Sequence, residues 1–458
     1  MKRIKWIALL AVFALLIAAC GDDDDATDET EATTTTAAAE TTTEATTPED
    51  TTPDLAGTTV TVFGPESSDE EAGAMQDALD VFAAETGIDI QYTGARDFSD
   101  QINAQAAGGN PPDIAVIPQP GKVGDFAREG YLAQIPDDVV ATVDAQWGPG
   151  WMDFYNFDGV QWGLPNKSDL KSIVWYNTAI FEAGGYEIPT TWDALLALTD
   201  QMIADGVTPW CVGIESGPAT GWTFTDWVED LMLRINDENV YDQWVSHEIP
   251  FDDDRIKAVF QEVLDLWNTE GAVFAAGGSI AATPFGDNGQ PLADGDCAMH
   301  RQASFFTAFI PEGVGIGEGL EIDTFYFPAL DESTRPILVA GTGVVAFRDA
   351  PEVWAVMEYL GSSEYSNARQ LAQIARKGGG EIASGYLTAN LGADPNNWYG
   401  PERFFVETLL TGSPARFDAS DLMPAAVGAG TFWTESTSIV NGDKTIDEGI
   451  AAIEASWP

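Results

Sequence analysis

The sequence predicts an α/β fold built on parallel β-sheets and divided into two lobes. Short β-branched segments alternate with segments whose apolar residues recur at helical spacing, an alternation typical of parallel sheets covered by helices. The chain has 458 residues, 45% of them hydrophobic. About 400 residues follow a polar N-terminal region, a length that can bury more than one core, so two lobes are expected.

The first folded unit is a predicted β-α-β arrangement. Residues 58–63 alternate and are rich in Thr and Val, which predicts a strand. The next segment has apolar residues at i, i+3, i+4 and i+7, one face of a helix: Met75, Ala78, Leu79 and Phe82. Gly87 is expected to end this helix before a second strand at residues 88–92.

A helix at residues 98–107 and a third strand at 113–117 continue the alternation. In open α/β sheets the ligand crevice lies beyond the carboxyl ends of the strands. The loops at residues 64–71, 93–97 and 118–122 are therefore the first places to look for a binding site.

Later segments carry further helix and strand signals. Helices are predicted at residues 192–204, 256–267, 351–360 and 446–457, the last opened by a capping box at Thr445 and Glu448. Residues 337–347 predict extended structure broken by glycine.

The N-terminus has the pattern of an export signal. The basic residues Lys2, Arg3 and Lys5 precede an apolar stretch from Trp6 to Ala19, and about 14 apolar residues fall short of the roughly 20 that span a bilayer. Residues 17–21 (IAACG) resemble the bacterial lipobox, which implies cleavage after residue 19 and lipid attachment to Cys20. The alternatives are a short anchor helix or secretion without lipid.

Residues 20–56 are rich in Thr, Ala and acid, with little that could be buried, and predict a disordered tether. The run Asp22–Asp25 lacks the glycine and closing glutamate of an EF-hand, so we interpret it as a solvated linker and expect no metal site there.

The chain is strongly acidic, with 74 Asp and Glu against 20 Lys and Arg and a net charge of −54. This balance argues against a nucleic-acid partner, because binding phosphates requires local positive charge. It suits a salty exterior, where counterions screen self-repulsion.

Apart from Cys20, the chain contains only Cys211 and Cys297. A pair of cysteines in an exported protein predicts a disulfide bond.

Several motifs occur in the order found in family 1 extracellular solute-binding proteins, the group that contains maltose-binding protein. They are residues 109–114 (GNPPDI) with 118–121 (PQPG), 171–177 (KSIVWYN) with 189–193 (PTTWD), 341–343 (GTG) with 350–351 and 358–360, and 432–433 with 439–442 (IVNG). The resemblance spans about residues 57–458. With residues 209–211 (PWC) and 297–305 (CAMHRQASF), the pattern is most similar to the α-glucoside-binding branch.

The resemblance implies a two-lobed periplasmic-binding-protein fold of type II, in which each lobe is a mainly parallel sheet flanked by helices and crossing hinge strands join the lobes. Lobe one would comprise residues 57–168 and 341–385, and lobe two residues 169–340 and 386–458. It also implies a lipid-anchored, extracytoplasmic, monomeric protein without cofactor that delivers a sugar to the permease of an ABC importer.

A sugar pairs apolar faces with hydroxyl groups, so aromatic rings, carboxylates and amides should coincide at its site. Trp433 lies where the resemblance places a stacking aromatic ring. Residues 215–222 combine an acid, small residues and an aromatic ring, which makes Glu215 and Trp222 candidates; the alternatives are a solvated Glu215 and a Trp222 in the core.

Five more candidates match positions of the family's ligand contacts: Arg96, Gln119, Asp169, Gln302 and Phe305. The first three could instead be surface ions or helix caps.

Two other functions remain open. A glycoside hydrolase needs only two suitably spaced carboxylates, yet the chain has no G-x-S-x-G, P-loop or HExxH motif, and His247 lacks the second histidine of a zinc site. The same fold could also bind a polyol or a polyamine, because fold alone does not fix the ligand.

Overall fold

The computed structural model describes residues 54–411 and 415–458. The predicted signal peptide, Cys20 and nearly all of the predicted tether lie outside the described residues. Within the described part of the chain, no helix has the length and hydropathy needed to cross a bilayer.

The first sheet has the strand order β13-β12-β3-β1-β2, with β6 pairing to β12. Its strands are β1 (Thr59–Gly64), β2 (Asp89–Gly94), β3 (Ile114–Ile117), β6 (Leu164–Leu170), β12 (Ile337–Ala346) and β13 (Ala415–Phe417). Strand β1 runs parallel to β2 and β3, whereas β12 runs antiparallel to β3 and β6.

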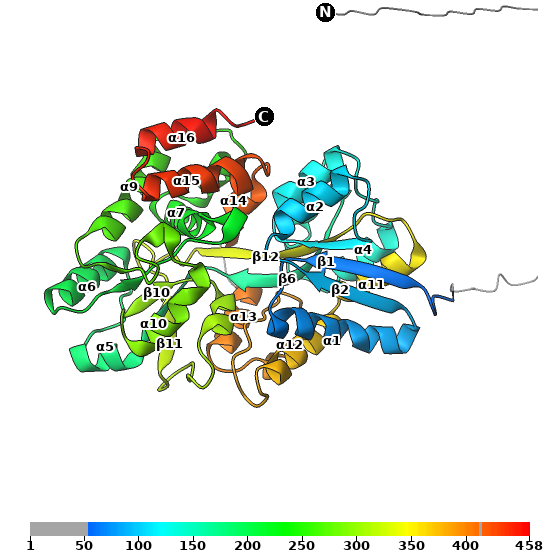
Figure 1. Ribbon diagram of the computed structural model, residues 1–458, viewed down its shortest axis with the longest axis horizontal. Helices are drawn as coiled ribbons and strands as arrows, with labels where there is room; N and C mark the ends of the chain where they lie inside the picture. Colours follow the sequence, from blue (N-terminus) through cyan, green and yellow to red (C-terminus); the bar gives the residue numbers. More distant parts are fainter. Residues whose placement is uncertain (1–53, 412–414) are drawn as a thin grey trace, which may run out of the picture. The chain divides into compact units, whose positions relative to one another are not determined.

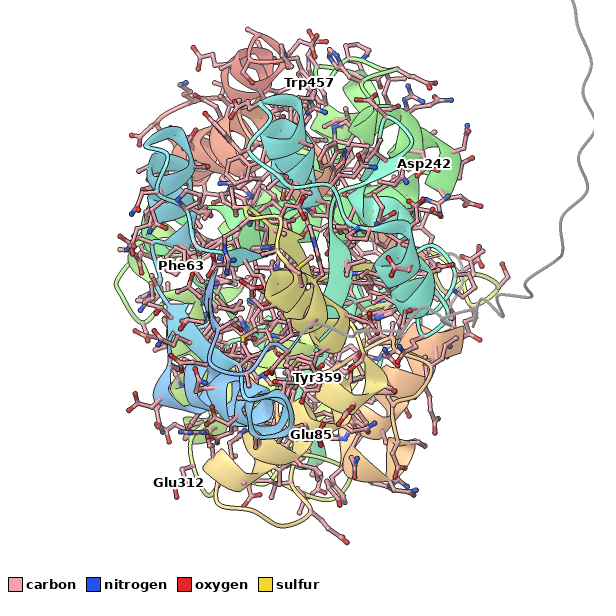
Figure 2. All side chains as sticks on the ribbon, turned by 90° about the vertical axis from the view of Figure 1, so that its right-hand side faces the viewer. Phe63, Glu85, Asp242, Glu312, Tyr359 and Trp457 are labelled. Atoms are coloured by element: carbon pink, nitrogen blue, oxygen red, sulfur yellow. A yellow bond between two sulfur atoms is a disulfide. The ribbon has the colours of Figure 1, made fainter. Side chains whose placement is uncertain are left out.

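Helices on both sides cover this sheet, with α2 and α3 on one side and α1 and α12 on the other (Figure 1). The helices of this lobe are α1 (Asp69–Thr86), α2 (Phe98–Ala107), α3 (Pro120–Arg128), α4 (Asp137–Asp144), α11 (Pro351–Leu360) and α12 (Ser363–Arg376). Tyr359 of α11, labelled in Figure 2, stacks on Phe82 of α1 at 4.5 Å between ring centroids and donates a hydrogen bond to the Ala78 carbonyl. These contacts bury the apolar stripe that the sequence predicts for α1.

The second sheet has the order β11-β7-β10-β8-β9 and is mixed, since β7 runs antiparallel to both its neighbours. Its strands are β7 (Ile173–Asn177), β8 (Trp210–Cys211), β9 (Val273–Phe274), β10 (Met299–Arg301) and β11 (Ile322–Tyr326). Its helices include α5 (Thr178–Gly184), α6 (Trp192–Ala204), α7 (Trp222–Ile235), α8 (Glu238–Val245), α9 (Asp254–Asn268), α10 (Gly289–Asp294), α15 (Trp433–Val440) and α16 (Ile446–Glu454).

Three chain segments join the two sheets. Strand β6 leads through residues 171–172 into β7, and β12 leads from the second sheet into the first, beside β6 (Figure 1). The third segment is β13, followed by the short helix α14 (Ala419–Leu422). These crossing segments divide the described fold into two lobes, one around each sheet.

Most of the predicted elements are confirmed within a residue or two. Gly87 ends α1 with a left-handed φ of 74°, and Thr445 and Glu448 form the predicted capping box. Helix α16 ends at Glu454, three residues earlier than expected. The glycines do not end β12, although its pairing with β6 shifts register between Thr342 and Gly343. A Cβ at Gly341 would lie only 2.1 Å from the Lys167 carbonyl oxygen, so glycine at this position lets β6 approach.

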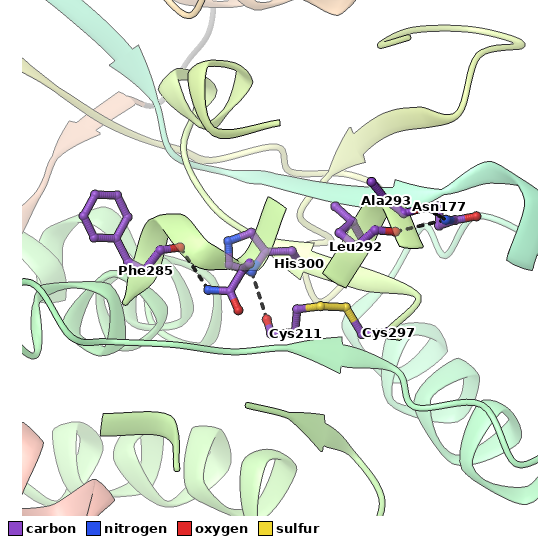
Figure 3. The surroundings of a disulfide bond; sticks show 8 residues. Asn177, Cys211, Phe285, Leu292, Ala293, Cys297 and His300 are labelled. Carbon is purple, nitrogen blue, oxygen red and sulfur yellow. Dashed lines mark hydrogen bonds between the residues drawn. A yellow bond between two sulfur atoms is a disulfide. The ribbon is translucent and has the colours of Figure 1, made fainter. Parts of the chain in front are cut away.

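The predicted Cys211–Cys297 disulfide is present, with 5.5 Å between the Cα atoms and a sequence separation of 86 residues (Figure 3). It joins the end of β8 to the turn before β10. His300 of β10 lies beside it, and its Nδ1 is 2.9 Å from the Cys211 carbonyl oxygen. The bond therefore fastens two strands that are already neighbours in the second sheet.

Candidate ligand-binding site

Three partly exposed aromatic rings from the second lobe lie together: Trp222 at the start of α7, Phe285 and Phe305. The Trp222 ring centroid is 5.0 Å from that of Phe285 and 6.0 Å from that of Phe305. We call these three rings the aromatic wall. Aromatic faces of this kind can pack against the C–H surface of a small ligand.

Two lysines of the first crossing segment reach the aromatic wall. Lys167 Nζ lies 5.9 Å from the Phe305 ring centroid, and Lys171 Nζ lies 5.4 Å from that of Trp222. Both distances fall within the range in which a cation is attracted to an aromatic face. The wall therefore abuts the segment that joins the lobes.

Lys167 also binds carboxylates on both sides of it. Its Nζ is 3.0 Å from Glu66, in the loop after β1, and 3.8 Å from Asp169. Arg369 of α12 holds the other oxygen of Glu66 at 2.7 Å. Burial alone would raise the pKa of Glu66, but Arg369 and Lys167 outweigh it and lower that pKa to about 2.

Asp169 connects this group to the second lobe. Ser304 Oγ donates to Asp169 Oδ1 at 3.3 Å and accepts from the Leu170 amide at 3.1 Å. Burial raises the pKa of Asp169 above its usual value despite the nearby Lys167. Ser304, the residue directly before Phe305, is thus hydrogen-bonded to the first crossing segment.

A second charged group surrounds Lys171. Its ammonium is 2.6 Å from Asp226 of α7 and also pairs with Asp418, which follows β13. Arg301 binds Asp226 at 3.2 Å and Asp230 at 2.7 Å. Burial raises the pKa of Asp226 to about 7, while Lys171 and Arg301 act in the opposite direction.

Asp226, Glu229 and Asp418 offer carboxylate oxygens within 4.8 Å of one another, a spacing that could suit a metal ion. Lys171 pairs with two of these three carboxylates, so a protein ammonium already supplies positive charge there. Burial raises the pKa of Glu229 well above its usual value. The arrangement is better described as a buried ion-pair network than as a metal centre.

The structure brings Asp169, Trp222 and Phe305 together among the predicted site residues. Glu215 is attached to the same region, because its carbonyl accepts from the Phe285 amide at 3.0 Å, while its side chain accepts from the Gly217 amide at 2.7 Å.

Trp433 is 4% exposed, and its indole Nε1 donates to Ser420 Oγ at 3.2 Å. Ser420 Oγ in turn donates to Asp418 at 2.8 Å. The ring thus reaches the Lys171 network through Ser420, and its burial limits how much of it a ligand could contact in this conformation.

Gln119 is 7% exposed at the start of α3, and within residues 54–411 and 415–458 its Oε1 has no hydrogen-bond partner. The close approach of Gly121 to the Met423 carbonyl places this end of α3 against the segment after α14. Gln302 is buried, with its side-chain oxygen accepting from the Ala303 amide at 2.8 Å. Arg96 is exposed in the loop after β2.

Sequence reasoning missed Glu66, Lys167, Lys171, Phe285 and Asp418. Two of them could have been found, because Glu66 lies in the loop after the first predicted strand and Lys171 opens a motif used for the resemblance. No local pattern marks Phe285 or Asp418, whose neighbours come from distant segments.

Comparison with known proteins agrees with this architecture. Residues 65–367 match the family model for bacterial extracellular solute-binding proteins. An alpha-glucosides-binding periplasmic protein of Rhizobium meliloti, AglE, is 36% identical over 88% of this chain and 88% of its own. An osmoprotective compounds-binding protein of Synechocystis, GgtB, is 37% identical over 85% of this chain and 90% of its own.

Solved structures share the fold at low sequence identity. The solute receptor AcbH has a TM-score of 0.71 at 19% identity, covering 87% of this chain and 97% of its own. The binding protein RafE in complex with raffinose has a TM-score of 0.66 at 17% identity, covering 87% and 98%. The predicted two-lobed α/β fold is confirmed, and the chain belongs to the family of bacterial extracellular solute-binding proteins.

Proposed function

We propose that this chain is the substrate-binding lipoprotein of a bacterial ABC importer, anchored outside the cell membrane through Cys20, and that it captures an α-glucoside as a monomer. The observation that carries the proposal is the aromatic wall of Trp222, Phe285 and Phe305 beside the ion-paired crossing segment. Such a wall offers apolar surface to sugar C–H faces, and Asp169 and Glu215 offer hydrogen-bond acceptors to hydroxyls.

The ligand would bind between the lobes and favour the conformation in which both lobes contact it. The candidates in lobe one are Arg96 and Gln119. The buried side-chain oxygen of Gln119 has no hydrogen-bond partner in the described part of the chain, and a sugar hydroxyl can donate to it. We include in this proposal the lobe boundaries predicted from the sequence, with residues 57–168 and 341–385 in lobe one and residues 169–340 and 386–458 in lobe two.

The charges near the wall favour a neutral ligand over a polyamine. Glu66 and Asp169 both lie within 4 Å of Lys167, and Asp226 and Asp418 pair with Lys171. Because protein cations already neutralise these carboxylates, a polyamine would find few free negative charges there. The same pairing argues against a glycoside hydrolase, whose two carboxylates must be free to reach the substrate.

A second candidate ligand is a polyol that acts as an osmoprotective compound, because the Synechocystis protein named for binding osmoprotective compounds is 37% identical. A polyol offers both C–H surface and hydroxyls, so the same wall would suit it.

A thermal-shift screen of the chain from Gly21 onward, at high salt, tests the proposal. Ligands would include maltose, trehalose, sucrose, longer α-glucans, glucosylated and free polyols, and polyamines, because a ligand that binds only the folded state raises Tm. A shift with α-glucosides that Trp222→Ala abolishes supports the proposal if it is retained in the control Trp354→Phe, a change at a buried tryptophan of α11 whose indole donates to Asp349. A shift only with polyamines, or turnover of an aryl glycoside, contradicts it.

A further inference from the structure

Lys171 lies between the Trp222 ring and the segments that join the two lobes. It lies in the two-residue connection between β6 and β7, and its side chain is 5% exposed. Its ammonium pairs with Asp226 of α7 and with Asp418 after β13, and it lies 5.4 Å from the Trp222 ring centroid. One charged group therefore contacts two of the three crossing segments and the aromatic wall.

The two carboxylates, rather than the ring, set the position of this ammonium. Burial favours the neutral form of a lysine, but the attraction of Asp226 and Asp418 outweighs it and keeps the pKa of Lys171 well above its usual value. Arg301 also binds Asp226 and so restrains that carboxylate independently of Lys171. The ammonium is thus held from two sides by charge-assisted bonds, each stronger than a cation–π contact.

Trp222 is less firmly held. It is the first residue of α7, it follows a glycine with a φ of 111°, and its ring remains partly exposed. In the described part of the chain, the indole ring contacts the rings of Phe285 and Phe305, which are themselves partly exposed, and the ammonium of Lys171. The fixed ammonium is therefore the firmest of the contacts that can set the tilt of the indole.

We propose that Lys171 is a positioning residue for ligand binding, which holds the Trp222 ring at a fixed tilt and ties that tilt to the crossing segments. This rests on the proposed function, in which Trp222 meets the ligand. A rotation of the lobes about the crossing segments would move Asp418 and Lys171 together and would carry the ring with them.

Fluorine NMR of the full chain, purified in mild detergent with 5-fluorotryptophan incorporated, tests the positioning directly. The resonance that disappears in Trp222→Phe identifies the ring. We expect Lys171→Met to shift or broaden that resonance, Lys171→Arg to restore it close to its original position, and Lys257→Met, a change at a partly exposed lysine of helix α9, to leave it unchanged. An unchanged Trp222 resonance in Lys171→Met overturns the proposal.

Calorimetric titration with the tightest sugar from the thermal-shift screen tests the consequence for binding. Loss of the cation should weaken Kd about tenfold in Lys171→Met, and Lys171→Arg should recover most of the affinity. If the resonance moves but Kd does not, the ring is held by Lys171 for another purpose and the proposal fails. If the wild-type chain binds no sugar, the proposed function fails, whereas the fluorine result still decides whether Lys171 holds the ring.

Lys171→Met removes a buried cation from between two carboxylates and could unfold the chain. The double variant Lys171→Met/Asp418→Asn removes one charge of each sign and leaves Asp226 its bond to Arg301. The same resonance shift and the same loss of affinity are expected of it, and their absence there contradicts the proposal equally.

Discussion

The carbonyl oxygen of Trp433 lies directly against Gly221, so that a Cβ at residue 221 would be 2.3 Å from it. Gly221 also has a φ of 111°, which side-chain-bearing residues rarely adopt. Two independent constraints thus require glycine where α7 begins and where Trp222 enters the aromatic wall.

Gly221→Ala should therefore lower the free energy of unfolding by about 2 to 4 kcal/mol, because strain and a backbone clash combine. Urea denaturation would measure it. Gly217→Ala is the matched control, since Gly217 has a φ of 57° with nothing near its missing Cβ, and should cost only about 1 to 2 kcal/mol. Equal losses in the two variants would show that the contact with Trp433 has no energetic weight.

Removal of the disulfide should destabilise the fold substantially. Closure of a loop across 86 residues corresponds to about 4 to 5 kcal/mol in the chain-entropy model. We expect the double variant Cys211→Ala/Cys297→Ala to show a free energy of unfolding lower by most of this amount, as measured by chemical denaturation. Reductant should weaken the wild-type chain and leave the double variant unaffected; a double variant as stable as wild type would contradict this account.

His300 should make stability depend on pH. Burial lowers its pKa from 6.5 to about 4, more than its bond to the Cys211 carbonyl raises it. Because the folded state resists protonation, its contribution is present above pH 6.5 and is lost as the pH falls toward 4, by up to about 3 kcal/mol.

The free energy of unfolding at pH 7 minus that at pH 4.5 measures this contribution. His300→Phe should reduce that difference relative to wild type. His247→Gln changes the other histidine, which stacks on Trp457 and whose Nε2 lies 3.0 Å from Glu454, and should not reduce that difference. A reduction of the same size in both variants would refute the assignment to His300.

Lys122 is a buried cation that forms no salt bridge with any residue of 54–411 or 415–458. Its Nζ donates to the Ser99 carbonyl at 3.4 Å and to Asn103 Oδ1 at 3.3 Å, and burial lowers its pKa to about 8 against the opposing effect of Asp100, Asp125 and Asp421. Its contribution to stability is therefore present above pH 10.5 and is lost as the pH falls through 8.

Lys122→Met should raise the free energy of unfolding at pH 7 by about 1 to 3 kcal/mol, because a buried charge is replaced by an apolar chain of similar length. Differential scanning calorimetry would show a higher Tm. Lys257→Met, at a partly exposed lysine paired with Asp447, should leave Tm unchanged. A lower Tm for Lys122→Met would mean that its two polar contacts outweigh the burial of charge.

Local rules predicted most of the elements because the relevant signals lie within a few residues. The stripe from Met75 to Phe82 and the stop at Gly87 fix α1, and Thr445 with Glu448 fixes the start of α16. Continuity of β12 could not be predicted, because it depends on how closely β6, more than 150 residues earlier in the chain, approaches Gly341.

The site was only partly predictable for the same reason. Asp169 and Phe305 were found through motif positions and Trp222 through the composition of residues 215–222, and the structure places the three together. Asp226 and Asp230 both lie in α7. Their ion pairing depends on Lys171 in the β6–β7 connection and on Arg301 in β10, which are distant in sequence from α7 and leave no local pattern.

The disulfide also turns part of the chain into a closed ring that carries α7, α8, α9 and α10. Trp222 and Phe285 belong to this covalently closed segment, and Phe305 follows Cys297 closely in sequence. A single proteolytic cut between the two cysteines would leave both pieces covalently joined, and they would separate only on reduction. The residues of the aromatic wall would therefore stay covalently linked after a single cut in any of the loops that connect those helices.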